Sequence, residues 1–240
     1  MAIVHSTTNY LDDDNILEAF FAYDDSIEGK RPVVLICHAW GGRDKFVTDK
    51  AIKLAEMGYV GFALDMYGKG VLGSGVEENS LLMRPFMDDR AMLQKRIKSA
   101  MAAARLLPWV DDNNIAAIGF CFGGLCVLDL ARTGADLKGV VSFHGLLGAP
   151  GNTDGNAIKA KILVLHGNDD PMAPLDHVIA LQKELSLAGA DWQVHNYGNA
   201  MHAFTNPLAN DPDFGTVYQL VADRRSWKSM ENFLDEIFQI

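Results

Sequence analysis

The chain has 240 residues, of which 49% are hydrophobic and 22% are charged, a composition typical of a globular protein with an ample core. Its formal net charge of −10 at pH 7 disfavours binding to a phosphate backbone, and no basic cluster offsets that charge. No apolar run approaches the roughly 20 residues that span a bilayer. We therefore expect one domain over residues 1–240, with neither nucleic acid nor membrane as a partner.

The three cysteines do not form a disulfide framework or a zinc-finger spacing, because their number is odd and they are scattered. Residues 1–14 also lack the basic and apolar segments of a secretory signal. We therefore expect a reducing, cytoplasmic location. Cys37 and Cys126 stand in apolar runs, which favours buried structural roles for both. No H-E-x-x-H or comparable spacing appears, so we expect no metal and no cofactor.

The first half of the chain predicts a hairpin followed by strands and helices. Two apolar and polar stretches, residues 3–10 and 16–23, flank an acidic turn and predict an antiparallel hairpin at a sheet edge. Strands are expected at 32–37 and 59–64, with a helix at 44–57 between them. A glycine-rich segment at 67–85, which resembles a lid or substrate loop, precedes a helix predicted over 85–107.

The second half continues the alternation of strands and helices. Strands are predicted at 115–118, 139–143, 162–165 and 192–197, with helices at 125–131, 174–188 and 216–238. Strands that alternate with helices indicate right-handed crossovers and a mostly parallel, doubly wound α/β sheet with helices on both faces. Ligands of such sheets bind at the carboxyl ends of the strands, where the motifs described next are also expected.

The stretch Gly119-Phe120-Cys121-Phe122-Gly123-Gly124 joins a predicted strand to a predicted helix. A nucleophile flanked by glycines in this setting sits on a sharp turn, since only glycine allows the close backbone approach. The thiol would also lie near backbone N–H groups and a helix N-terminus, which favour a thiolate. Cys121 is therefore the candidate nucleophile, although most free cysteines are simply small buried hydrophobes.

A cysteine nucleophile needs a base and a group that orients that base. His202 is the candidate base because it lies in a loop after the last predicted strand. His5, His177 and His195 are expected to be solvated or packed, and His144 and His166 are each followed by glycine and are expected to make turn hydrogen bonds.

The candidate acid lies in the turn from His166 to Pro174, where two prolines fix the backbone and two adjacent carboxylates, Asp169 and Asp170, are present. Either choice gives the chain order cysteine, acid, histidine. This is the order of the α/β-hydrolase fold and not that of the trypsin or subtilisin families.

The cysteine elbow, the acid turn and the loop His202-Ala203-Phe204 together resemble the dienelactone hydrolase family of α/β-hydrolases, and the similarity extends over about residues 16–238. The resemblance favours Asp170 as the acid, because the family's acid stands three residues after the glycine and four before a proline. It also implies an oxyanion hole made by the backbone N–H groups of Ala39 and Phe122.

Two departures from the family pattern bear on the substrate. Dienelactone-cleaving members have a glutamate just after the first long strand, where this chain has His38, followed by Ala39 and Trp40. We hypothesise that His38 lies near the thiol and alters its activation; the alternative is a loop histidine that bonds to backbone. The loop after His202 also lacks the family's carboxylate-binding arginine. Arg84 or Arg90 could supply that cation, although a solvated surface charge is the favoured role for each.

The predicted function is hydrolysis of a small ester, lactone or thioester through an acyl-cysteine at Cys121, with His202 as the proton shuttle and Asp170 as its orienting acid. Substrate-binding roles are assigned to His38, Trp40 and Arg84. The alternatives are a thiol-based binding or redox-responsive protein on the same fold, and an acyl transferase. The sequence leaves the natural substrate and the oligomeric state open.

Overall fold

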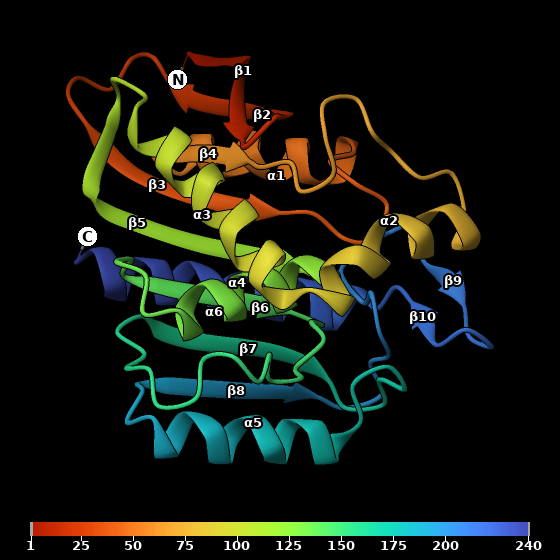
Figure 1. The fold of residues 1–240 in the computed structure, drawn as a ribbon. Coiled ribbons are helices and arrows are strands. Elements are labelled where there is room, and N and C mark those ends of the chain that lie inside the picture. Colours follow the sequence, from red (N-terminus) through yellow and green to blue (C-terminus); the bar gives the residue numbers. More distant parts are fainter. Residues whose placement is uncertain (1, 240) are drawn as a thin grey trace. The chain divides into compact units, whose positions relative to one another are not determined.

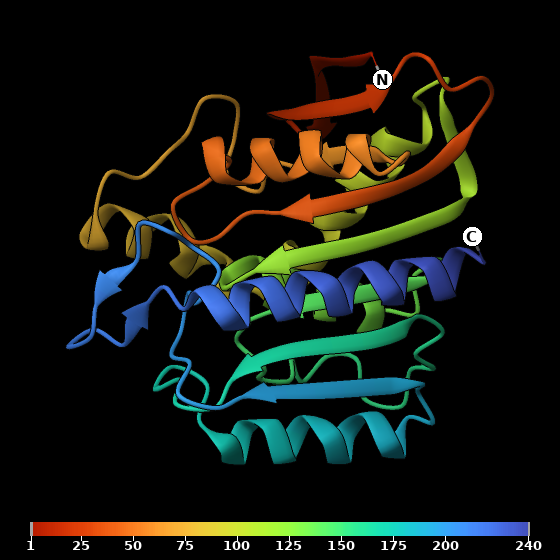
Figure 2. The same ribbon diagram turned by 180° about the vertical axis from the view of Figure 1, so that it is seen from behind.

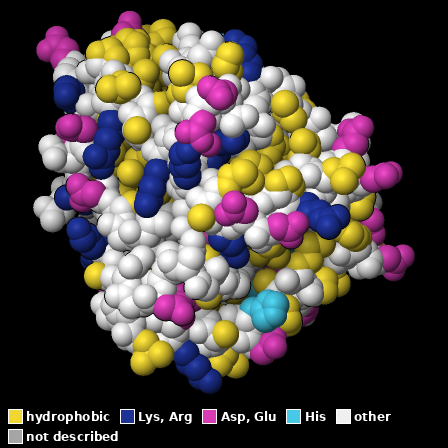
Figure 3. All heavy atoms as spheres, in the orientation of Figure 1, with side chains coloured by type: hydrophobic (Ala, Val, Ile, Leu, Met, Phe, Trp, Pro, Cys, Tyr) yellow, Lys and Arg dark blue, Asp and Glu magenta, His cyan; other side chains and the backbone are white. Residues whose placement is uncertain are grey.

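The computed structural model describes residues 2–239 and divides the chain into two compact units, Met1–Ile118 and Gly119–Ile240. The prediction of one domain over residues 1–240 stays a prediction. No helix among residues 2–239 is both long and apolar enough to cross a membrane. On the face drawn in Figure 3, basic side chains lie interspersed with acidic ones. The predicted lack of a nucleic-acid partner and the cytoplasmic location also stay predictions.

The first unit is built on strands and three helices. Its elements in chain order are β1 (Ile3–Asp12), β2 (Asn15–Asp24), β3 (Arg31–Cys37), α1 (Lys45–Glu56), β4 (Val60–Ala63), α2 (Val76–Asp88), α3 (Arg90–Arg105) and β5 (Val110–Phe120), whose last two residues begin the second unit. The strand order is β1-β2-β4-β3-β5. The β1–β2 hairpin is antiparallel with β1 at its edge, as predicted, and β3 pairs with β4 in parallel.

Burial explains why these segments form strands covered on both sides. Every residue of β4 and all but one of β3 are buried, the pattern of a strand packed on both faces. Helices α1 and α3 lie on opposite sides of the sheet of this unit, as the two opposite views show (Figures 1 and 2). Helix α1 begins at the predicted place because the Asp44 side chain accepts hydrogen bonds from the N–H groups of Phe46 and Val47.

The prediction of one helix over 85–107 is wrong. The structure has two helices, because Asp89 adopts an extended conformation (φ −126°, ψ 91°) and caps α3 by accepting a hydrogen bond from the Met92 N–H at 2.9 Å. Proline is common at the first position of a helix, which favours a helix start at Pro85, but Pro85 lies inside α2. Residues 76–85 of the predicted lid are therefore helical, and the role of segment 67–85 as a lid stays a prediction.

The second unit contains a parallel sheet with helices on both faces. Its elements are α4 (Phe122–Arg132), β6 (Gly139–Phe143), β7 (Lys161–Gly167), α5 (Leu175–Leu187), β8 (Trp192–Tyr197), β9 (Asn210–Asp211), β10 (Thr216–Val217) and α6 (Leu220–Phe238). Strands β6, β7 and β8 pair in parallel. Helices α4 and α6 lie on opposite sides of these strands (Figures 1 and 2). The predicted mostly parallel α/β fold with an N-terminal antiparallel hairpin is confirmed.

One short element of the second unit was not predicted. We expected the last helix to begin near Thr216, but Thr216 and Val217 form β10, which pairs antiparallel with β9, and α6 begins at Leu220. Gln219 caps α6, because its side-chain oxygen accepts a hydrogen bond from the Ala222 N–H at 2.6 Å. The β9–β10 hairpin lies beyond the carboxyl ends of β7 and β8 (Figure 1).

Candidate active site

Cys121 lies on the turn between β5 and α4 in a backbone conformation that residues other than glycine rarely adopt. Its backbone angles are φ 55° and ψ −116°, and its side chain is partly exposed. The Cys121 N–H donates to the Phe143 carbonyl at 3.0 Å, and the Cys121 carbonyl accepts from the Gly124 N–H at 2.9 Å. Backbone strain of this kind concentrates at functional sites because the surrounding structure must hold it in place.

The glycines of the elbow are explained by the close packing of its backbone. A Cβ atom on Gly119 would lie 2.0 Å from the Gly123 carbonyl oxygen, and one on Gly124 would lie 2.6 Å from Ser142 Oγ. No side chain fits at either distance, so both positions require glycine. The strand can therefore approach the helix closely enough to present the thiol at the tip of the turn. The other two cysteines, Cys37 and Cys126, are fully buried, as predicted.

Asp170 is held by the turn that follows β7. Its Oδ1 accepts hydrogen bonds from the N–H groups of Met172 at 2.8 Å and Ala173 at 3.2 Å, and its Oδ2 lies 2.7 Å from His202 Nδ1. Its neighbour Asp169 is exposed, and its Oδ1 accepts a hydrogen bond from the Asn168 side chain. Of the two carboxylates in this turn, the structure brings Asp170 to the histidine.

His202 is buried between the acid and the thiol. Nδ1 donates to Asp170, while Nε2 has no hydrogen-bond partner among the described residues. Burial disfavours the charged ring, but a thiolate at Cys121 and the hydrogen bond to Asp170 outweigh that effect and raise the pKa of His202 to about 10. The ring can therefore carry a proton at neutral pH while it faces the sulfur.

Two further histidines lie beside His202, and sequence reasoning did not assign them there. The ring of His144 is 5.3 Å from that of His202, and its Nε2 is 2.8 Å from Thr205 Oγ1. His166 is fully buried in β7, and neither of its ring nitrogens has a hydrogen-bond partner. Burial lowers the pKa of His166, and the neighbouring charge of His202 acts in the same direction.

The prediction that these two histidines make turn hydrogen bonds is wrong for both. His144 bonds to a side chain 61 positions away, and the His166 ring bonds to no group. Their position at the ends of neighbouring strands, β6 and β7, was the signal that could have placed them next to the His202 loop. His5, His177 and His195 lie within β1, α5 and β8 respectively.

The remaining predicted site residues are distributed over both units. Phe122 is the first residue of α4, so its N–H lies at the helix N-terminus directly after the thiol. Ala39, His38, Trp40 and Arg84 belong to the first unit. The roles of Ala39 in an oxyanion hole and of the other three in substrate binding stay predictions. Arg84 is exposed and forms an ion pair with Asp88 at 3.4 Å.

His38 is held by backbone groups of its own unit. Its Nδ1 donates to the Ala39 carbonyl at 2.6 Å, and its Nε2 accepts from the Met66 N–H at 3.1 Å. The ring is fully buried, and burial lowers its pKa. These bonds define a neutral ring with the proton on Nδ1. The loop that follows is tied to the glycine-rich segment, because the Tyr67 hydroxyl donates to the Trp40 carbonyl and the Gly73 N–H donates to the Gly41 carbonyl, both at 3.0 Å.

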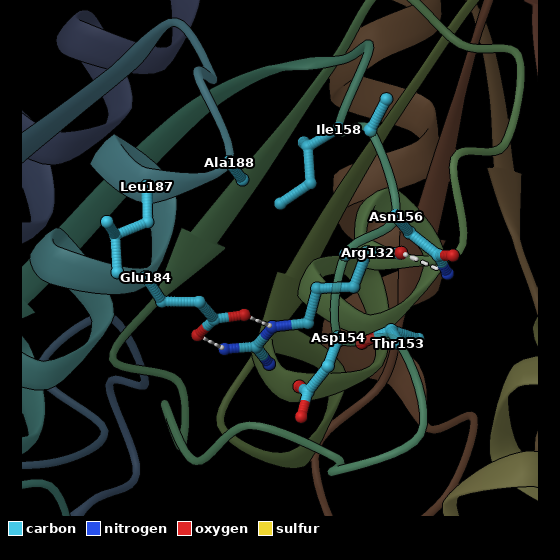
Figure 4. A pocket seen from close by; sticks show the side chains of 10 residues that line it. Arg132, Thr153, Asp154, Asn156, Ile158, Glu184, Leu187 and Ala188 are labelled. Carbon is cyan, nitrogen blue, oxygen red and sulfur yellow. Dashed lines mark hydrogen bonds and ion pairs between the residues drawn. The ribbon is translucent and has the colours of Figure 1, made fainter.

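A cavity of about 520 Å³ in the second unit contains none of the predicted catalytic residues. It lies between Arg132, residues 153–158 and the end of α5 (Figure 4). The Arg132 guanidinium donates to both oxygens of Glu184, to Asp129 and to the carbonyls of Leu147 and Gly148. These bonds use all five of its donors, so the arginine holds the cavity wall together and has none left for an anion.

Within residues 2–239, no three His, Cys, Asp or Glu side chains lie close enough together to hold a metal ion. The second unit brings together the thiol of Cys121, the imidazole of His202 and the carboxylate of Asp170.

The chain is similar to known proteins over most of its length. Residues 17–238 match the dienelactone hydrolase family. A putative carboxymethylenebutenolidase of Yersinia pestis is 28% identical over 227 residues, which cover 89% of this chain and 81% of that protein. An uncharacterised protein of Caenorhabditis elegans is 37% identical over 158 residues, which cover 63% of this chain and 98% of that one.

Solved structures agree over almost the whole chain. A dienelactone hydrolase-like promiscuous phosphotriesterase from metagenomic libraries superposes with a TM-score of 0.92 at 35% identity and covers 99% of both chains. A putative dienelactone hydrolase of Klebsiella pneumoniae superposes with a TM-score of 0.81 at 22% identity and covers 98% of this chain and 99% of that one, which supports the fold alone. The chain is an α/β-hydrolase and belongs to the dienelactone hydrolase family.

Proposed function

We propose that this protein hydrolyses a small ester, lactone or thioester through a covalent acyl-cysteine at Cys121. The single observation that carries the proposal is the arrangement of Asp170, His202 and the strained, partly exposed thiol within one unit. The 2.7 Å bond from His202 Nδ1 to Asp170 Oδ2 fixes the imidazole so that Nε2 is left to handle the proton of the thiol. The site contains a nucleophile, a base and an orienting acid, the minimum set for acyl transfer through a thiol.

In the proposed first half-reaction, His202 Nε2 holds the proton removed from Cys121 while the thiolate sulfur attacks the carbonyl carbon of the substrate. The carbonyl π electrons move to the oxygen, which gives a tetrahedral oxyanion. The oxyanion then collapses, the bond to the leaving atom breaks, and His202 gives its proton to that atom, which is oxygen in an ester or lactone and sulfur in a thioester. The products of this step are a thioester on Cys121 and the leaving group, which is an alcohol from an ester, the opened end of the same molecule from a lactone, or a thiol from a thioester.

In the second half-reaction, water attacks the thioester carbonyl while neutral His202 removes a proton from it. The second tetrahedral oxyanion expels the Cys121 thiolate, which is stabilised by the imidazolium formed in the same step. The acid product leaves and the site returns to its starting state. Asp170 orients the ring and stabilises its charged form in both half-reactions.

The Phe122 N–H is the proposed donor to the oxyanion. It belongs to the first residue of α4, and the dipole of the helix favours negative charge at this end. One such donor contributes about 3 to 4 kcal/mol to the transition state. The second donor, which the family resemblance assigns to Ala39, stays a prediction.

The substrate class is proposed from the family and from what the chain lacks. The loop after His202 has no arginine to bind a substrate carboxylate, so the proposal is not restricted to dienelactones. Because one relative of known structure is described as a promiscuous phosphotriesterase, a phosphotriester belongs in the substrate screen beside short esters and lactones with and without a carboxylate.

The proposal is tested by hydrolysis of a p-nitrophenyl acyl ester by wild type and Cys121→Ala. We expect the variant to lose at least about 10³-fold in kcat, since removal of a catalytic nucleophile costs more than this in comparable enzymes. Cys126→Ala is the matched control, because it removes a fully buried thiol five positions away in α4. Intact mass after rapid quenching should show one acyl group on wild type and none on Cys121→Ala.

Two other results would replace the proposal. Unchanged ester hydrolysis by Cys121→Ala would remove the acyl-cysteine mechanism altogether. Stoichiometric acylation of Cys121 without turnover would favour a thiol-based binding or redox-responsive protein. Transfer of the acyl group to an added alcohol faster than to water would instead favour an acyl transferase, which shares the first half-reaction but not the second.

A further inference from the structure

The β9–β10 hairpin is bonded directly to the backbone of His202. The His202 N–H donates to the Gly215 carbonyl at 3.0 Å, and the His202 carbonyl accepts from the Val217 N–H at 3.1 Å. Both backbone polar groups of the histidine are therefore bonded to one three-residue segment, in which Thr216 is the residue bridged to His202. The position of the imidazole thus depends on where this hairpin lies.

The same segment also touches the acid turn. Gly215 has φ +83°, and a Cβ atom added to it would lie 2.2 Å from Cγ and 2.9 Å from Cδ of Pro171. Pro171 directly follows Asp170, whose Oδ2 holds the His202 ring. One residue, Gly215, thus binds the backbone of the histidine through its carbonyl and packs its bare Cα against the neighbour of the acid.

The hairpin is closed upon itself and is therefore able to act as a rigid spacer. Asn210 and Asp211 pair with Val217 and Thr216, and the Tyr218 N–H donates to the Ala209 carbonyl at 2.9 Å. At its turn, the Phe214 N–H donates to the Asp211 side chain at 3.0 Å. A displacement at Gly215 would consequently move the two bonds to His202 instead of being absorbed within the hairpin.

We infer that the β9–β10 hairpin is the element that sets the distance between Asp170 and His202, and that Gly215 is its positioning residue. The inference rests on the proposed function, because it assigns to Gly215 a role in the same catalytic pair. Gly215 touches neither substrate nor reacting atoms. It acts through His202, to which it is hydrogen-bonded, and Pro171, against which it packs. The absence of a side chain at position 215 is therefore required for proton transfer as well as for the turn.

Gly215→Ala tests the inference, with Gly155→Ala as the matched control. Gly155 has nearly the same φ, +80°, but its added Cβ would meet nothing within 4 Å. Both variants carry the strain of a side chain at positive φ, and only Gly215→Ala also presses on Pro171. We expect kcat for ester hydrolysis to fall about 10²-fold in Gly215→Ala with KM nearly unchanged, as a displacement near 1 Å does. Gly155→Ala should resemble wild type.

A readout specific to the His202–Cys121 pair separates positioning from general damage. The rate of Cys121 alkylation by iodoacetamide is measured against pH in wild type, Gly215→Ala and His202→Asn. We expect the profile of Gly215→Ala to shift toward that of His202→Asn, while Gly155→Ala keeps the wild-type profile. A wild-type profile and wild-type kcat in Gly215→Ala would overturn the inference.

Removal of the opposing ring supplies a rescue. In the double variant Gly215→Ala/Pro171→Ala, the two atoms that the new Cβ would strike are gone, so kcat should return to that of Pro171→Ala alone. Additive losses in this cycle would contradict the proposed contact. If Gly215→Ala does not fold, Val217→Pro removes the hydrogen bond to the His202 carbonyl by another route, and wild-type kcat in that variant would equally contradict the inference.

The inference and the proposed function fail in different ways. Unchanged hydrolysis by Cys121→Ala, or identical alkylation profiles for wild type and His202→Asn, would remove the proposed function. If those two variants behave as proposed while Gly215→Ala resembles wild type, only the role of the hairpin falls.

Discussion

Two loops of this protein, one in each unit, carry a buried histidine soon after a strand. The pKa values of these two histidines are shifted in opposite directions. His38 directly follows β3, and His202 lies in the loop after β8. Both side chains are almost fully buried. Burial lowers the pKa of His38, whereas the pKa of His202 is raised to about 10.

The difference arises from the partners of the rings, since the burial is alike. His38 has backbone groups on both nitrogens, and these define a neutral ring. His202 faces the Asp170 carboxylate on one side and the sulfur of Cys121 on the other, and both attract a proton to the ring. Burial makes a histidine sensitive to its neighbours, and the charge of those neighbours then decides whether the ring can shuttle a proton.

The strongest test of this contrast is His202→Asn. We expect kcat for ester hydrolysis to fall about 10⁶-fold, as when the histidine of a comparable triad is removed, because the sulfur then has no base. His195→Asn is the control, since His195 is a half-buried histidine of β8 that bonds to Ser229 Oγ at 3.2 Å. A loss of kcat smaller than tenfold in His202→Asn would contradict the assignment of His202 as the base.

Asp170→Asn tests whether the carboxylate is what distinguishes the His202 loop. An amide keeps the shape but can donate to Nδ1, which leaves the ring in the wrong tautomer, so we expect kcat to fall about 10⁴-fold. Asp169→Asn changes the adjacent exposed carboxylate and should keep kcat within about twofold of wild type. Equal losses in the two variants would contradict the assignment of Asp170 as the orienting acid.

Much of this architecture could be predicted from local sequence patterns. The N-terminal hairpin, the buried strands and the capped start of α1 depend on periodicity, turn residues and the Asp44 cap, all of which are written in short segments. The elbow could also be predicted, because the glycines on both sides of Cys121 stand in one short segment, although Gly124 is required by its contact with the distant Ser142. Family resemblance separated Asp170 from Asp169 before the geometry was known.

Two of the three features that could not be predicted depend on contacts between distant residues. The strands β9 and β10 have two residues each, too few for any periodicity, and their pairing is stabilised by bonds to the His202 loop. The break between α2 and α3 follows from the extended backbone of Asp89, in a stretch whose apolar spacing alone reads as one helix. The approach of His144 to His202 joins the end of β6 to the loop after β8, which no local pattern encodes.

A third buried histidine, His166, predicts how stability should change with pH. Its pKa is lowered in the folded protein, so below the ordinary value of 6.5 the unfolded chain binds a proton that the folded chain does not. Stability should therefore fall as pH drops from about 6.5, by at most about 1.4 kcal/mol for each pH unit from this group. In His166→Leu this acid-side loss should be smaller, because Leu has nothing to protonate.

The measurement for His166 is urea unfolding of wild type and variant at several pH values between 5 and 8. His177→Gln, which changes an exposed histidine of α5, is the matched control and should keep the wild-type dependence. Because both nitrogens of the buried ring lack partners, His166→Leu should also lose little stability at pH 7. If the free energy of unfolding of His166→Leu fell below pH 6.5 as steeply as that of wild type, this histidine would not be the group that links folding to pH.

The smallest expected effect concerns His38 and completes the contrast between the two loops. We hypothesise that His38 alters the activation of Cys121, and as a neutral ring it could do so only through its dipole and its hold on the loop. His38→Gln should therefore shift the pH profile of Cys121 alkylation by less than His202→Asn does. A profile identical to wild type would remove His38 from thiol activation and leave it as a residue that bonds the Ala39 carbonyl and the Met66 N–H. The loop after β3 would then differ from the loop after β8 in having no role in thiol activation, as well as in the charge of its histidine.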